Sequence, residues 1–109
     1  MTWRTIALGS LLALATAGAP TASHGGDGAA RVAIHEFHFE PARVTIPVGG
    51  TVTWSNADEE AHTVTASDRS YSSDGLEHAE VFTHRFTAPG TYQYFCALHP
   101  HMTATVVVQ

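Results

Sequence analysis

Apolar and polar residues alternate in short stretches along most of the chain after residue 30. Val32 and Ile34 alternate with polar neighbours, the phase then slips by one position, and Phe37 and Phe39 carry the pattern on. Alternation with a period of two is typical of a half-buried strand. A slip of one residue inside such a strand predicts a β-bulge, which we expect near residues 35–36.

The later stretches follow the same pattern and are separated by turn residues. Val44, Ile46 and Val48 alternate, and Pro47 stands on the opposite phase, which predicts an edge strand. No segment after the first 23 residues has a helical period. Short strands with turns roughly every 8–12 residues predict an all-β fold, an antiparallel β-sandwich or barrel of about seven to eight strands with Greek-key connections. Further strands are expected at 51–54, 62–65, 82–86, 90–96 and 103–108.

The first 30 residues differ from the rest of the chain. Arg4 precedes an apolar run at residues 6–17, and small residues follow it. This order is typical of a secretory signal peptide, which we expect at 1–23, before a flexible leader at 24–30. The run is too short to span a bilayer, so we expect no membrane span in the mature protein. We predict one domain at 31–109 in a periplasmic or secreted protein.

The composition excludes some partners and draws attention to one thiol. Ten acidic residues oppose five arginines, for a net charge of −5. Nucleic acids and anionic membrane surfaces attract basic proteins, so neither is an expected partner. Cys96 is the only cysteine, whereas exported proteins usually carry cysteines in pairs. A single exported thiol suggests a role such as metal ligation.

Cys96, His99 and Met102 stand three residues apart directly after a predicted strand. A thiolate, an imidazole and a thioether suit copper, because soft sulfur ligands select this ion. A trigonal copper site needs a second imidazole. His62 is the candidate, because it begins a strand directly after a loop, and a sandwich would bring it to the same end as the loop that follows Cys96. We therefore predict one copper ion bound by these four residues.

At these positions the chain resembles the cupredoxins, the small blue copper proteins related to plastocyanin and azurin. The two short gaps between the last three ligands are similar to the ligand loop of amicyanins. The motifs that carry the resemblance are Phe37-x-Phe39-x-Pro41, Thr51-Val-Thr-Trp54-x-Asn56-x-Asp58, His62-Thr-Val and Pro89-Gly-Thr-Tyr-x-Tyr94-x-Cys96-x-x-His99-Pro100-x-Met102.

The resemblance implies a Greek-key β-sandwich with one type 1 copper ion. It implies that His62, Cys96 and His99 are equatorial ligands and that Met102 is the axial ligand. It also implies a small electron shuttle rather than an enzyme. One departure is Thr63, which stands where many relatives have an asparagine that pins the two ligand loops together. A threonine hydroxyl can still form one hydrogen bond there.

As partners we expect redox proteins, such as a c-type cytochrome or a dehydrogenase, which dock transiently near His99 on a monomeric protein. The acidic run Asp58, Glu59 and Glu60 precedes His62 and could steer a basic partner over long range. The other interpretation of this run is a solvated loop.

Three alternatives stay open at this point. The first is a periplasmic copper carrier or sequestering protein, which the eight histidines keep in view although there are only two methionines. The second is a structural zinc site, which would prefer Cys and His without a thioether. The third concerns two extra histidines: His24 could form a weak second copper site near a processed amino terminus, and His101 could modulate docking at the copper edge.

Overall fold

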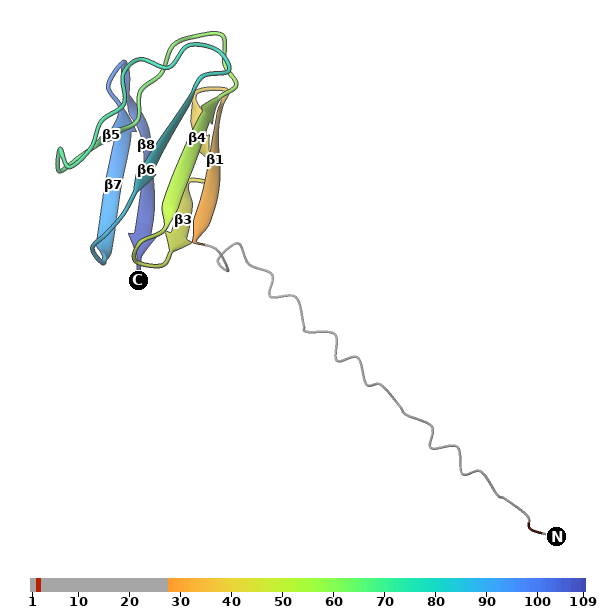
Figure 1. Cartoon of the computed structure of the whole chain (residues 1–109). Coiled ribbons are helices and arrows are strands. Elements are labelled where there is room, and N and C mark those ends of the chain that lie inside the picture. Colours follow the sequence, from red (N-terminus) through yellow and green to blue (C-terminus); the bar gives the residue numbers. More distant parts are fainter. Residues whose placement is uncertain (1, 3–27) are drawn as a thin grey trace.

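Two four-stranded β-sheets pack face to face and enclose the core (Figure 1). The structure is a computed structural model and describes residue 2 and residues 28–109. Apart from residue 2, the expected signal peptide at 1–23 lies outside these described residues, as does His24. The strands are β1 (Ala29–His35), β2 (His38–Glu40), β3 (Arg43–Ile46), β4 (Thr51–Asn56), β5 (Thr65–Ala66), β6 (Val81–Arg85), β7 (Gly90–Cys96) and β8 (His99–Val108).

The expected β-sandwich is confirmed, with one correction to its strand directions. The first sheet has the order β2-β1-β4-β6 and the second the order β3-β8-β7-β5. Strands β1 and β4 pair in parallel, as do β3 and β8, so both sheets are mixed rather than antiparallel. The chain crosses between the sheets after β2, β3, β4, β5 and β6, and strands that return to a sheet by such crossings need not run antiparallel to their neighbours.

A tight turn replaces the bulge that we expected near residues 35–36. His35 pairs with His38, and the two residues between them, Glu36 and Phe37, have φ values of 51° and 60°. Two consecutive positive φ values are the signature of the two-residue hairpin turn that suits twisted strands. The apolar phase therefore slips because β1 ends and β2 begins. The first strand also starts at Ala29, inside the segment 24–30 expected to be a leader.

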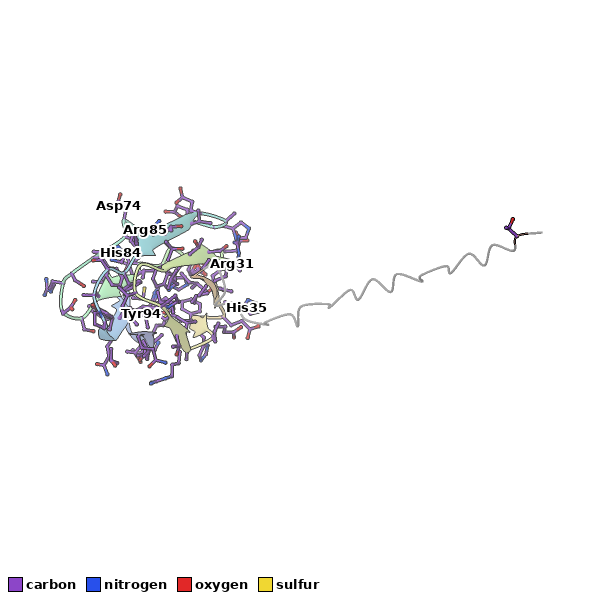
Figure 2. The ribbon with its side chains drawn as sticks, turned by 60° about the horizontal axis from the view of Figure 1, so that its bottom comes forward. Arg31, His35, Asp74, His84, Arg85 and Tyr94 are labelled. Atoms are coloured by element: carbon purple, nitrogen blue, oxygen red, sulfur yellow. The ribbon has the colours of Figure 1, made fainter. Side chains whose placement is uncertain are left out.

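Aromatic rings fill much of the space between the sheets. Trp54 on β4 is fully buried, and its ring centroid lies 5.4 Å from that of Tyr94 on β7. Figure 2 shows Tyr94 in the interior, between the two layers of strands. Burial raises the pKa of the Tyr94 phenol to about 12, since ionisation would place a charge in this apolar interior. Among the described residues there is no helix that could cross a membrane.

Asn56 organises the loops at the end of the sandwich where β4 and β7 end and β8 begins, at the top of Figure 1. Its side chain is fully buried and donates hydrogen bonds to the backbone oxygens of Glu60 at 2.9 Å and Leu76 at 2.8 Å. The same side chain accepts a hydrogen bond from the Asp58 amide at 2.9 Å. These bonds hold the loop before His62 against the loop around Leu76, and thereby fix where His62 emerges.

Candidate metal centre

Three side chains converge at the loop end of the sandwich. Cys96 is the last residue of β7, His99 is the first residue of β8, and His62 forms a bridge with Leu76. The Cys96 Sγ lies 3.7 Å from His62 Nδ1 and 3.6 Å from His99 Nδ1. All three donor atoms lie within 4.8 Å of one another. The structure thus brings together residues that stand 34 positions apart along the chain.

Met102 lies beside this cluster for a topological reason. In the β7–β8 pairing Phe95 faces Thr103, but the next pair joins Cys96 to His99. Residues 100–102 are therefore extra on the β8 side and form an irregularity next to the thiol. The Met102 side chain, 3% exposed, is buried at this irregularity. All four predicted residues consequently belong to one end of the fold, whereas the neighbouring His101 is exposed.

Thr63 connects the two loops that carry the donors. Its backbone amide donates a hydrogen bond to Cys96 Sγ at 3.3 Å. Its hydroxyl oxygen accepts a hydrogen bond from the Ala97 amide at 2.7 Å and lies 2.9 Å from the Thr65 hydroxyl. The hydrogen bond that we expected of the hydroxyl at this position is therefore confirmed. A donor to the sulfur also matters chemically, because hydrogen bonding around a metal-bound thiolate tunes its reduction potential.

Replacing Thr63 with valine should lower the free energy of unfolding by roughly 0.5–1.5 kcal/mol, the usual net contribution of one hydrogen bond, because the Ala97 amide that loses its acceptor is only part-buried. Valine keeps the shape of the side chain but removes the oxygen that accepts from Ala97. The matched control is Thr63→Ser, which keeps the hydroxyl and should lose markedly less. Denaturant unfolding of the metal-free proteins measures both values. Equal losses in the two variants would show that the hydroxyl does not connect the loops.

Asp58 is a partner of His62 and not a free surface charge. Its Oδ2 lies 2.8 Å from His62 Nε2. The hydrogen bonds that it accepts outweigh the opposing effect of burial, and hold the pKa of the Asp58 carboxyl below its usual range. An ionised carboxylate can only accept, so Nε2 carries the ring proton and Nδ1 presents its lone pair toward Cys96. Long-range steering of a basic partner remains a prediction for this acidic run, in which Glu59 and Glu60 are exposed.

Phe37 is a second neighbour that the pattern of the sequence did not identify. It lies at the tip of the β1–β2 turn and is 37% exposed. Its ring is edge-on to both imidazoles, with centroids 5.0 Å from His62 and 5.0 Å from His99. The alternation of apolar residues indicated a buried strand position for Phe37, and only the turn at Glu36 and Phe37 directs it to this end.

The donor set fits copper. One thiol sulfur and two imidazole nitrogens lie within 4.8 Å of one another, and a thioether side chain is buried beside them. Two imidazoles, a thiolate and a weak axial thioether form the ligand set of blue copper electron-transfer sites. Zinc prefers nitrogen and thiolate donors, and a thioether is not among its usual ligands.

Known proteins resemble this chain in sequence and in structure. The family model described as a cupredoxin-like domain matches residues 5–108. Amicyanin-alpha of Methylorubrum extorquens is 32% identical over 87 residues, which cover 75% of this chain and 73% of that protein. Amicyanin of Paracoccus denitrificans is 32% identical over 88 residues, which cover 76% of this chain and 67% of that protein. A purple cupredoxin from Nitrosopumilus maritimus superposes with a TM-score of 0.70 at 30% identity, covering 73% of this chain and 99% of the other.

Proposed function

The chain belongs to the cupredoxin-like domain family, and on this basis we propose that it is a type 1 copper protein that carries single electrons between redox partners. His62, Cys96, His99 and Met102 would hold the ion, with the two imidazoles and the thiolate as the main ligands and the thioether as the weak one. The observation that carries this proposal is the convergence of Cys96 Sγ and the two imidazole Nδ1 atoms within 4.8 Å. Bound copper supplies a one-electron couple that requires no bond to a substrate.

The residues around the ligands favour a geometry that hardly changes between the two oxidation states. His62 and Cys96 are fully buried, and each is held by a hydrogen bond: His62 Nε2 donates to the Asp58 carboxylate, and Cys96 Sγ accepts from the Thr63 amide. The turn between Cys96 and His99 contains only two residues. Ligands held this firmly need little rearrangement on gain or loss of an electron, which favours fast transfer. A simple electron carrier needs no further catalytic group.

The surface at His99 is the proposed docking site. His99 is partly exposed, Leu98 is 54% exposed and Pro100 is exposed beside it. A small apolar patch with charged groups around it suits a contact that forms and releases quickly. We propose redox proteins as partners, for example a c-type cytochrome or a dehydrogenase, and a monomeric state. The expected signal peptide at 1–23 supports a periplasmic or secreted location.

A copper carrier is the weaker alternative, because such a protein must release its ion readily. Burial of His62 and Cys96 at 0% exposure opposes release. A redox titration of the copper-loaded protein tests the choice. We expect one electron per copper, reversible over repeated cycles, with the ion retained against a competing acceptor. Loss of copper during cycling or rapid transfer to the acceptor would support the carrier instead.

Removing the charges of Glu59 and Glu60 by a double substitution to glutamine should slow electron transfer to a basic c-type cytochrome several-fold at low ionic strength. Both side chains are exposed near His62, and long-range attraction between exposed charges is screened by salt. The matched control is the pair Glu40→Gln and Asp68→Asn, which removes the same charge from other exposed positions. Stopped-flow rates over a salt series give the comparison. Equal slowing in both double variants would contradict steering by Glu59 and Glu60, because the change in net charge alone would explain the slower electron transfer.

A further inference from the structure

One carboxylate ties together two parts of the chain that meet at the metal centre. Asp58 Oδ1 accepts a hydrogen bond from the Glu36 amide at 2.7 Å, and Oδ2 accepts one from the Phe37 amide at 2.9 Å. Oδ2 also accepts from His62 Nε2 at 2.8 Å. The carboxylate side chain is 11% exposed, so little water competes for these bonds. This one group therefore accepts from three donors: two adjacent amides of one turn 21–22 residues away, and the ring of a residue four positions on.

The two amides belong to the turn that carries Phe37. Both Glu36 and Phe37 adopt positive φ, a conformation that side-chain-bearing residues seldom take. The carboxylate compensates by binding both amides of the turn. The Phe37 ring then lies edge-on to His62 at an interplanar angle of 87° and to His99 at 89°. The orientation of this ring is consequently linked to the same group that binds His62.

We propose that Asp58 is a positioning residue for both imidazoles, and this inference rests on the proposed function. It holds His62 directly, by keeping the proton on Nε2 so that Nδ1 is free for the metal. It holds His99 indirectly, by fixing the turn whose Phe37 ring contacts the His99 ring. Hydrogen-bond partners of metal-binding histidines orient the ring and contribute to metal affinity in this way.

Asp58→Asn is the direct test. An asparagine amide has one acceptor oxygen and a donor NH₂ group, so it cannot accept from Glu36, Phe37 and His62 together. We expect a loss of Cu(I) affinity of about 10–100-fold, measured by competition with a chromogenic Cu(I) chelator. The matched control is Glu59→Gln, which removes the same charge one residue away from a side chain 84% exposed. An equal loss in the two variants would overturn the proposal, because charge alone would then explain it.

Nitrogen NMR of the His62 ring gives a second readout that needs no copper, and its wild-type result alone can test the proposal. In the metal-free protein with neutral imidazoles we expect the proton on Nε2, and in Asp58→Asn we expect a mixture of tautomers. A wild-type ring protonated on Nδ1 would overturn the proposal even if the variant failed to fold. If the wild type bound no copper, the proposed function would fail, whereas the tautomer would still report on Asp58.

Phe37→Leu tests the indirect contact. Leucine keeps the backbone amides that bind Asp58 but removes the aromatic edge between the two imidazoles. We expect copper to leave for the chelator several-fold faster, while the His62 tautomer stays as in the wild type. A copper release rate equal to that of the wild type would show that Asp58 does not position His99 through the Phe37 ring.

Discussion

Replacing Cys96 with serine is expected to abolish the intense visible absorption of the copper-loaded protein. This absorption arises from charge transfer between a thiolate and copper, and serine supplies no thiolate. The substitution is nearly isosteric, and Cys96 is the only cysteine, so no other thiol can take its place. Its sulfur lies within 3.7 Å of both imidazole nitrogens.

The matched control for this substitution is His101→Asn. His101 lies two residues after His99 but is exposed, and it is not in the cluster of donor atoms. Its removal should leave the band in place. The visible spectrum of each protein after addition of Cu(II) makes the comparison. A band that survives in Cys96→Ser, or one that disappears in His101→Asn, would contradict the ligand set.

Replacing Trp54 with alanine should cost about 3–5 kcal/mol of the free energy of unfolding, the usual loss when a large buried aromatic residue is truncated. Trp54 is fully buried, and its ring lies 5.4 Å from Tyr94, 5.7 Å from Phe82 and 6.1 Å from Tyr71 between centroids. A small domain is stable by only about 5–15 kcal/mol. The variant should therefore be close to unfolding.

Val81→Ala is the control for the core substitution. Val81 lies on β6, which pairs with the strand that carries Trp54, but it is 60% exposed. The substitution should change the free energy of unfolding by no more than about 0.5 kcal/mol, as for most surface substitutions. Urea unfolding of the metal-free proteins measures both. A loss below about 1 kcal/mol for Trp54→Ala would show that the aromatic core is not the main source of stability.

The sequence was most informative where a local pattern determines the structure. Alternation marked most strands, because the two faces of a strand point to different surroundings. The spacing of Cys96, His99 and Met102 indicated the candidate metal centre, because a short hairpin places these side chains at one end of the sandwich. His62 could be added because it directly follows a loop, although the strand expected at 62–65 is wrong: β5 contains only Thr65–Ala66, and His62 forms an isolated bridge with Leu76. Thr63 could be assigned a hydrogen bond because it follows His62.

Other features depend on contacts that no local pattern records. The parallel pairing of β1 with β4 follows from crossings between the sheets, and each crossing leaves the direction of the next strand open. The turn at Glu36 and Phe37 lacks the glycine or asparagine that usually indicates positive φ. It is held instead by Asp58, 21–22 residues away. The one local clue to Asp58 was its position four residues before His62, which the acidic neighbours Glu59 and Glu60 obscured.

A crystal structure of the copper-loaded protein, with anomalous scattering measured at the copper edge, tests the central claim most directly. We predict a single strong copper peak within the described part of the chain, bound by Cys96 Sγ and by the Nδ1 atoms of His62 and His99. Met102 should approach from the side at a longer distance. A copper peak away from Cys96, or a His62 ring turned away from the ion, would contradict the account.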